Sequence, residues 1–246
     1  MLGDRAEEFI AYHRAYGAHP VLVGARAQAT CRSRYTEDQL ARTAAGGIGQ
    51  YVILGAGLDT FAYRSPLAGR VRVFEVDHPA TQEWKRRGRL APRAPGSVAF
   101  VPVDLVGDSL GDGLRRAGFD FTAPAFVSWL GVTMYLDQGA IERTASVLGA
   151  LAPRTELVVD YMLPAGLRDA AGDSYADQVG QAAAERGEPW VSLFGPDAMA
   201  ALLAGCGFSP ARNVSQREMI PSGLWDRSDG LRPAELSHIA HAVIDR

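Results

Sequence analysis

The sequence has few cysteines and almost no lysine, and both facts limit the kinds of functional site that it can form. Cys31 and Cys206 lie far apart, and neither belongs to a CxxC pair or to a Cys/His cluster with the spacing of metal ligands. We therefore expect free thiols in a reducing compartment and no metal site. Lys85 is the single lysine among 25 basic residues, so arginine carries almost all of the positive charge.

Long apolar runs and a strong net charge are also absent. No apolar stretch approaches the roughly 20 residues that a membrane span needs, and the acidic N-terminal residues Asp4, Glu7 and Glu8 do not fit a secretory signal. A formal net charge of −3 provides no broad cationic surface for a phosphate backbone. We expect a cytoplasmic protein that binds neither nucleic acid nor a membrane.

The order of helix-like and strand-like segments predicts an α/β protein. Residues 5–45 are alanine-rich and charged, which favours helix, with interruptions predicted at His19-Pro20 and in the CRSRY segment, residues 31–35. Beyond residue 50, short apolar runs alternate with helix-compatible sequence, which is typical of βαβ units in a parallel sheet covered on both faces. These runs span residues 51–55, 71–76, 97–103, 124–130 and 155–162. Further segments predict helices over about 166–187 and from Gly195-Pro196-Asp197, then a last pair of strands around 210–220.

The strongest motif is a glycine-rich turn directly after the first apolar run. Gly55-Ala-Gly57-Leu-Asp59-Thr60 joins a strand to a helix, and glycine there lets a nucleoside approach the main chain. A tight strand-to-helix turn also uses glycine for structural reasons alone, so the turn by itself is a weak signal.

Two acids at the end of the second run strengthen the signal. Asp77 lies 20 residues beyond Gly57, the spacing at which an acid accepts hydrogen bonds from ribose hydroxyls. Glu75 is a further candidate for cofactor binding, and an ion pair with an arginine is its structural alternative. Together, the turn and these acids predict a nucleoside-binding site.

The end of the third run adds a contact for the base. Asp104 is placed to accept a hydrogen bond from an adenine amino group, while Leu105 packs against the ring. The structural alternative for Asp104 is the N-cap of a helix that begins near Ser109.

The chemistry of the glycine turn favours S-adenosylmethionine over NAD. Thr60 replaces the third glycine of the dinucleotide fingerprint, and Asp59 places a negative charge where a pyrophosphate would bind. A sulfonium cation tolerates that acid. An NAD(P)-dependent reductase is the main alternative, although its usual Tyr-x-x-x-Lys pair is impossible around Lys85. A non-catalytic nucleoside-binding protein is the second alternative.

The ordered motifs LGAGLDT, FEVDHP, VPVDL and WLGVTMYL, within about residues 32–163, resemble the leucine carboxyl methyltransferase family, in particular its bacterial members. That resemblance implies a Rossmann-like class I methyltransferase fold of the α/β class, with a mostly parallel seven-stranded sheet. It implies one domain over residues 1–246, with a helical cap at 1–48 and the core at 49–246. S-adenosyl-L-methionine is then the methyl donor.

The resemblance also implies roles for individual residues. It supports the cofactor contacts already given for the glycine turn, the ribose acid and the adenine pair, namely Gly55, Gly57, Asp77, Asp104 and Leu105. The family uses an arginine before the first strand to bind the methionine carboxylate, and Arg34 is the first match, with Arg32 as the alternative. Leu130 stands where the family commonly has a glutamate.

The implied reaction is O-methylation of a carboxyl or hydroxyl group on a small-molecule or natural-product-like acceptor by direct in-line transfer. A carboxylate is ionised at pH 7 and needs no base, whereas a hydroxyl benefits from one. Tyr135 and Tyr161 lie near the ends of the fourth and fifth runs, and these two residues, with Trp190, are candidates for the acceptor pocket. Packing in the core is the alternative for each aromatic ring.

Overall fold

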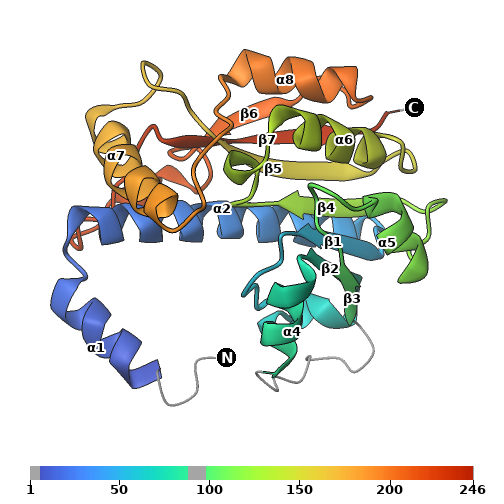
Figure 1. Ribbon diagram of the computed structural model, residues 1–246, viewed down its shortest axis with the longest axis horizontal. Helices are drawn as coiled ribbons and strands as arrows, with labels where there is room; N and C mark the ends of the chain where they lie inside the picture. The colour runs from blue at the N-terminus through green and yellow to red at the C-terminus, as the bar shows by residue number, and fades with distance from the viewer. Residues whose placement is uncertain (1–5, 88–97, 246) are drawn as a thin grey trace.

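The computed structural model describes residues 6–87 and 98–245, in which seven strands form one sheet with helices on both faces (Figure 1). The strand order is β3-β2-β1-β4-β5-β7-β6, and β7 is the strand that runs antiparallel to its neighbours. This confirms the predicted α/β fold with a mostly parallel seven-stranded sheet. The strands are β1 (Gln50–Leu54), β2 (Arg72–Asp77), β3 (Val98–Pro102), β4 (Ala125–Trp129), β5 (Glu156–Met162), β6 (Arg212–Ser215) and β7 (Ser237–Val243).

The strand order changes direction at β1, which has β2 on one side and β4 on the other. Leu54 is opposite Val76 in β2 and opposite Trp129 in β4, so these three parallel strands end at the same level. In open α/β sheets a ligand binds beyond the carboxyl ends of the strands where the order reverses. The glycine-rich turn, Asp77 and the loop after β4 therefore meet at the expected edge.

Helices cover the two faces of the sheet and one of its ends. One face carries α2 (Pro20–Ala45), α3 (Phe61–Arg64), η2 (Pro66–Gly69) and α4 (Pro79–Arg87). The other carries α5 (Leu110–Arg116), α6 (Gln138–Gly149) and α8 (Pro196–Gly205). The remaining elements are α1 (Ala6–Tyr16) and α7 (Ala170–Glu185), at one end of the sheet in Figure 1, and the short helices η3 (Thr133–Tyr135) and η4 (Ser222–Trp225).

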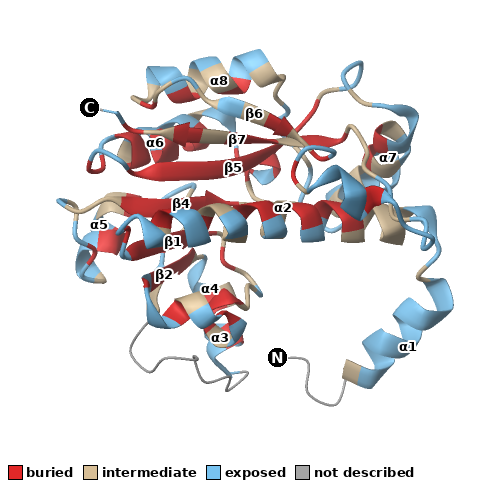
Figure 2. Cartoon of the chain, turned by 180° about the vertical axis from the view of Figure 1, so that it is seen from behind, coloured by how far each residue is buried: buried red, intermediate tan, exposed pale blue. Residues whose placement is uncertain are grey.

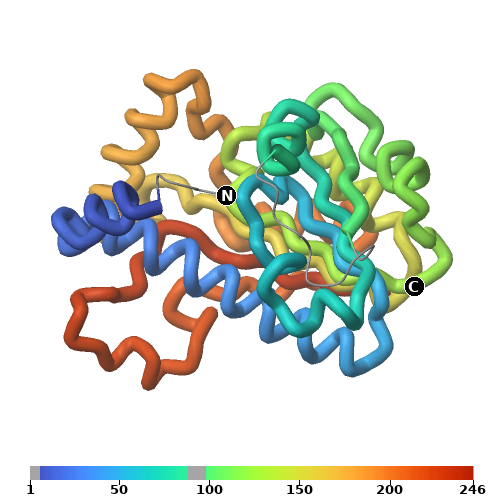
Figure 3. Tube along the Cα trace, turned by 90° about the horizontal axis from the view of Figure 1, so that it is seen from below, coloured from blue at the N-terminus to red at the C-terminus, as the bar shows by residue number. Residues whose placement is uncertain are grey.

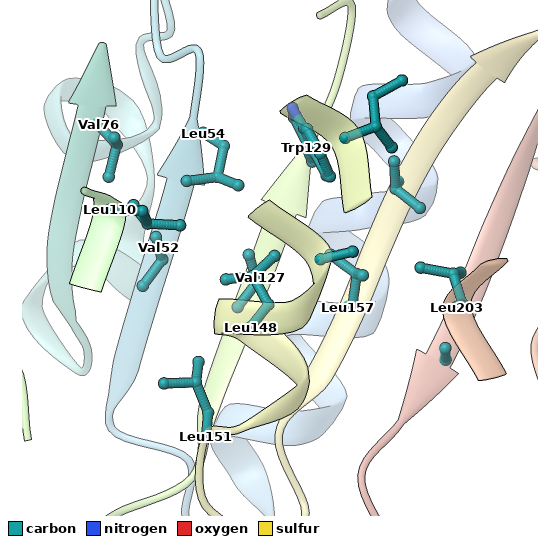
Figure 4. Close-up of a cluster of buried hydrophobic side chains, with 14 of the residues drawn as sticks. Val52, Leu54, Val76, Leu110, Val127, Trp129, Leu148, Leu151, Leu157 and Leu203 are labelled. Carbon is teal, nitrogen blue, oxygen red and sulfur yellow. The ribbon is translucent and has the colours of Figure 1, made fainter. Parts of the chain in front are cut away.

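Side chains that alternate along the strands pack into two separate hydrophobic cores, one on each face of the sheet. In β1, Val52 and Leu54 pack against α5 and α6, whereas Tyr51 and Ile53 pack toward α2 and α3. Figure 4 shows the first of these cores, with Val127 and Leu157 beside Leu148 of α6. Burial on both faces explains why the strands read as nearly continuous apolar runs.

Helix α2 begins where the sequence predicts but is longer than expected. Its N-cap is His19 and its first residue Pro20, which confirms the break between α1 and α2. The interruption expected at residues 31–35 was wrong, because α2 runs unbroken through them. Its buried face includes the polar residues Gln28 and Thr36, and the Thr36 hydroxyl donates to the Arg32 carbonyl at 2.8 Å. Because polar residues occupy part of the buried face of α2, the sequence lacks the regular spacing of apolar residues that predicts a helix.

Buried positions in α2 start at Ala27, so most of this helix belongs to the layer over the sheet. By contrast, α1 has no buried residue and projects from the body of the molecule, as the pale colouring in Figure 2 shows. The part of residues 1–48 that stands beyond the sheet is therefore α1 with the first turns of α2.

The C-terminal third combines correct predictions with one error. Helices α7 and α8 lie where the sequence places them, and β6 lies within 210–220. The second strand expected there was wrong, because β6 pairs with β7, more than 20 residues further on. In β7, His241 forms a hydrogen bond with the Glu156 carboxylate at 2.9 Å, so a buried strand carries polar residues and lacks an apolar pattern. No helix within 6–87 or 98–245 combines the length and the apolar character that a bilayer crossing requires.

Candidate functional site

The glycine-rich turn forms one wall of a pocket of about 220 Å³ at the carboxyl end of β1. Gly55 has φ of +65°, and a Cβ there would lie 2.2 Å from a methyl carbon of Val132. Gly57 also has a positive φ, of +43°. Both glycines are therefore required by the turn, which confirms its sharp geometry and leaves main-chain atoms open to a ligand.

Helix α2 brings Arg32 to this pocket and keeps Arg34 away from it. Arg32 lines the pocket, and its Nη1 donates to Asp160 at 2.7 Å. Arg34 is 59% exposed in its side chain and pairs with Asp38 at 2.7 Å on the surface. Residues two positions apart on a helix point about 200° apart, so only one of the two arginines can face the sheet. The first match, Arg34, is therefore the arginine that faces away from the pocket, and the alternative, Arg32, is the one that lines it.

Asp160, which the sequence analysis missed, holds Arg32 in place. It lies two residues before the end of β5 with a side chain that is 1% exposed, and its second carboxylate oxygen accepts from the Gly131 backbone N–H at 2.6 Å. Gly131 has φ of +74°, and a Cβ there would come within 2.7 Å of Arg32 Nη2. Both residues are visible in the sequence, but their link depends on how α2 packs across β4 and β5.

Leu130 forms part of the same wall and packs partly against the core under α2. An aliphatic side chain thus occupies the position where the sequence comparison with the family expects a glutamate. The acid that touches the arginine in this chain is Asp160 instead.

Asp77 lies beside the glycine turn, where the spacing predicts it. One carboxylate oxygen accepts from the Gly57 backbone N–H, and the other accepts from the His78 backbone N–H at 2.7 Å. The side chain thus joins the end of β2 to the turn after β1. A carboxylate in this position is available to the hydroxyls of a bound nucleoside.

Glu75 does not line the pocket, which corrects its place among the cofactor contacts. Its carboxylate forms an ion pair with Lys85 of α4 at 2.7 Å, and the two side chains are only 1% and 2% exposed. Burial raises the pKa of Glu75, and the Lys85 charge opposes that rise. The ion pair weighed as the alternative is therefore present, but its partner is the single lysine rather than an arginine.

Asp59 lines the pocket and marks the start of α3. Its carboxylate accepts from the Phe61 backbone N–H at 2.7 Å. Burial raises its pKa, against the Phe61 hydrogen bond and the charges of Lys85 and Arg64. An acid thus stands at the helix start, as the sequence predicts.

Asp104 and Leu105 follow β3, two strands from β1. The Asp104 carboxylate accepts from the Val106 backbone N–H at 2.9 Å, and its own N–H donates to Asp108. The N-cap of α5 is Ser109, so the alternative role for Asp104 was wrong. Leu105 lines a surface groove between α5 and α6 and packs against the first core.

The three aromatic candidates for the acceptor pocket have different environments. Tyr161 is fully buried and donates to Asn213 at 2.7 Å, so it belongs to the core and its assignment to the acceptor pocket is corrected. Trp190 packs against Gly180 and near Met134, in a small apolar cluster. Tyr135 is 41% exposed and lines a cavity of about 600 Å³ between α1, α2 and α7.

Comparisons with known sequences agree with this geometry. The sequence profile described as Leucine carboxyl methyltransferase matches residues 5–149. YktD of Bacillus subtilis, which is assigned as an S-adenosyl-L-methionine-dependent methyltransferase, is 34% identical over 219 residues, covering 86% of this chain and 71% of its own length. A Mycobacterium bovis protein with the same assignment is 37% identical over 145 residues, which span 57% of this chain and 46% of the relative.

Solved structures show the same fold at lower identity. A DUF574 family protein from Streptomyces avermitilis has a TM-score of 0.66 at 21% identity, covering 96% of this chain and 89% of its own. A Burkholderia thailandensis N1-methyltransferase, solved with 1,6-didemethyltoxoflavin and S-adenosylhomocysteine, has a TM-score of 0.53 at 15% identity, covering 98% of this chain and 90% of its own. At these identities the likeness concerns the fold alone.

Proposed function

Because this chain belongs to the leucine carboxyl methyltransferase family and is an S-adenosylmethionine-dependent methyltransferase, we propose that it methylates an oxygen of a small-molecule acceptor. A carboxyl group is the preferred acceptor and a hydroxyl group the second candidate. A soluble natural product or metabolite of modest size fits the proposal.

The state of the histidines is the observation that favours a carboxyl group. Four of the five have a ring nitrogen engaged: His19 and His78 accept from backbone N–H groups, and His238 and His241 bond carboxylates. A hydroxyl acceptor gains most from a free base, whereas a carboxylate is already ionised at pH 7. Apart from His13, which lies against Tyr12 on α1, each histidine thus has a ring nitrogen engaged, and this favours an acceptor that needs no proton removed.

The pocket residues fit the cofactor on two grounds. First, Arg32 keeps donors beyond the Nη1 atom that binds Asp160, so its guanidinium can also bind the methionine carboxylate. Second, the position of a Cβ on Gly57 lies no closer than 3.8 Å to any neighbouring atom and faces Asp77, so this glycine leaves room for a nucleoside to approach the chain. In this proposal Asp77 binds the ribose, while Asp104 and Leu105 bind the adenine.

The cofactor supplies a methyl group on a sulfonium: an acceptor oxygen forms the new C–O bond while the C–S bond breaks and its electron pair returns to sulfur. The chain's own part is to orient and to exclude water. Asp160 fixes the Arg32 guanidinium, and the glycine turn with Asp59 leaves a negative charge on the side of the sulfonium. A carboxylate acceptor loses its charge in the step, so no proton needs to leave.

Substitution of the two arginines tests the cofactor site. Arg32→Ala is expected to weaken S-adenosylmethionine binding by about tenfold to a hundredfold, the loss of a charge-assisted hydrogen bond. Arg34→Ala is the matched control and should leave the affinity unchanged. Isothermal titration with S-adenosylmethionine and S-adenosylhomocysteine measures both. Equal affinities in the two variants contradict the role of Arg32.

The acceptor atom is tested by product chemistry. The protein is incubated with S-adenosylmethionine carrying a radioactive methyl group and a panel of carboxylic acids, phenols and amines. Methyl esters release labelled methanol in mild base, whereas methyl ethers and methylamines do not. Label that resists base and resides on nitrogen in every product contradicts the proposal.

A further inference from the structure

A second cavity lies at the end of the sheet where α1 and α7 stand. Its volume is about 600 Å³, within the usual range for a small-molecule site. Its walls come from four separate elements: α1, the start of α2, η3 and the C-terminal half of α7. Figure 3 shows α1 and α7 together at the same end of the molecule.

Three tyrosines from two elements line this cavity. Tyr12 and Tyr16 lie on α1, with ring centroids 5.0 Å apart and planes tilted by 45°. Tyr135 lies on η3. All three are at least 41% exposed, which leaves a large apolar area without a partner. Flat faces with a negative quadrupole suit an aromatic ring, which can meet them in an offset or edge-to-face arrangement.

Tyr135 is held firmly although its ring is exposed. The carbonyl of the preceding residue, Met134, accepts from the Val191 backbone N–H at 2.7 Å, and Ser192 donates to the Leu136 carbonyl at 2.6 Å. The segment before α8 therefore clamps η3 on both sides of the tyrosine. A fixed ring presents its face to a ligand at little entropic cost.

Arg186 supplies the cavity with a positive charge that has no acid to pair with. It ends α7, and its Nη1 donates to the Ala182 carbonyl at 3.3 Å. Among the described residues no carboxylate lies within ion-pair distance of it, Glu188 on the same cavity wall included. A guanidinium with free donors is suited to a carboxylate.

The loop after β4 connects this cavity to the pocket at the glycine turn. A Cβ on Gly55, which lines that pocket, would lie 2.2 Å from a methyl carbon of Val132, and a Cβ on Gly131 would lie 2.7 Å from Arg32 Nη2. Tyr135 lies three residues beyond Val132 and lines the cavity. A ligand beside Tyr135 would therefore lie next to the methyl donor's pocket.

We propose that this cavity binds the methyl acceptor and that the acceptor is a planar aromatic carboxylate. The assignment rests on the proposed function and names its substrate class. The ring lies among Tyr12, Tyr16 and Tyr135, and Arg186 attracts the anion. One carboxylate oxygen takes the methyl group, the sulfonium becomes a thioether, and a methyl ester leaves without any proton transfer.

The binding test uses protein saturated with S-adenosylhomocysteine and three related probes. Naphthalene-2-carboxylate has both the ring and the charge; naphthalene-2-carboxamide lacks the charge; decahydronaphthalene-2-carboxylate lacks the aromatic faces. Titration calorimetry should give the tightest binding for the first probe. Each of the other two should bind about fivefold to tenfold more weakly. Equal binding of all three overturns the assignment.

Variants separate the two recognition elements. Tyr135→Leu keeps an apolar wall but removes the ring, so it should weaken both naphthalene probes and spare the saturated acid. Arg186→Gln should weaken the two acids and spare the carboxamide. Arg116→Gln, on the exposed surface of α5, is the control and should bind every probe like the wild type. Unchanged probe binding in Tyr135→Leu and Arg186→Gln overturns the assignment.

Two outcomes separate failure of this acceptor assignment from failure of the proposed function. Protein that binds S-adenosylhomocysteine and forms base-labile methyl esters only with aliphatic acids would retain the function and lose this assignment. Protein that binds naphthalene-2-carboxylate in the stated pattern but transfers methyl groups to nitrogen alone would lose the function.

Discussion

The pocket at the glycine turn and the cavity lined by Tyr135 are built in opposite ways. Around the glycine turn, ionic groups are buried and paired: Arg32 with Asp160, and Glu75 with Lys85 beneath β2. Around Tyr135 and α1, aromatic and charged groups are exposed, and α1 buries no residue at all. The first region is held by buried ion pairs, whereas the second leaves aromatic faces exposed to solvent.

The largest effect on stability is expected from a substitution that leaves a charge unpaired in the region of buried ion pairs. In Lys85→Met the Glu75 carboxylate remains buried without its partner, and the free energy of unfolding should fall by about 3–5 kcal/mol. Urea denaturation measures the loss. The double variant Glu75→Leu with Lys85→Met should recover most of it, because the pair is replaced by apolar groups. A neutral single variant would mean that the pair is solvated.

A second substitution tests whether the fixed position of Arg32 matters for cofactor binding. Gly131→Ala adds a Cβ within 2.7 Å of Arg32 Nη2 at a φ of +74°. It should cost about 1–2 kcal/mol of stability from backbone strain and about tenfold in cofactor affinity from displacement of the guanidinium. Gly230→Ala is the control, with φ of +75° and open space around it. Equal losses of affinity in both variants would trace the effect to strain alone.

A smaller effect is expected with pH at the opposite edge of the sheet. Burial disfavours ionised Glu156, but the hydrogen bond from His241 and the Arg42 charge outweigh it, so its pKa lies below the ordinary value. A depressed carboxyl pKa stabilises the fold above the unfolded value of about 4.3, and the contribution is lost as pH falls through the folded value. Thermal unfolding of Glu156→Gln between about pH 6 and pH 3 should therefore vary less with pH than the wild type. Identical slopes would contradict this.

The smallest effect is expected on α1. Ile10 is 49% exposed, so Ile10→Ser should change the free energy of unfolding by no more than about 0.5 kcal/mol. Cofactor affinity should also stay at the wild-type value. Urea denaturation and titration calorimetry measure the two quantities. A loss above about 1 kcal/mol would show that α1 packs against the body in solution and would remove the contrast between the regions.

The sequence predicts the sheet well because its strands are buried on both faces. The five runs from residue 51 to residue 162 became β1 to β5, and the glycine turn and Asp77 lie together as their spacing requires. Local chemistry decides such features: a strand that ends in glycine needs no information from distant residues.

Features that depend on packing between distant segments could not be predicted from the sequence. The contact of Arg32 with Asp160 joins residues 128 positions apart, and no spacing rule points to it. Glu75 looks like a second site acid because it lies close to Asp77 in the sequence, yet it lies within β2 and pairs with Lys85 of α4, whereas Asp77 ends the strand and reaches the glycine turn. Tyr161 likewise faces α8 rather than the ligand edge. The side of a strand that a residue faces is settled by tertiary structure.

Because Lys85 is buried, cleavage of the chain at lysine can measure the local opening of α4. A protease that cuts only after lysine has a single cleavage site here, and that site lies within α4, at a side chain that is 2% exposed. Under native conditions the rate of that one cut reports how often α4 lifts from β2. Because Asp77 ends the strand beneath that helix, slower cutting at rising cofactor concentration would register ligand binding without a label, a substrate or an engineered probe.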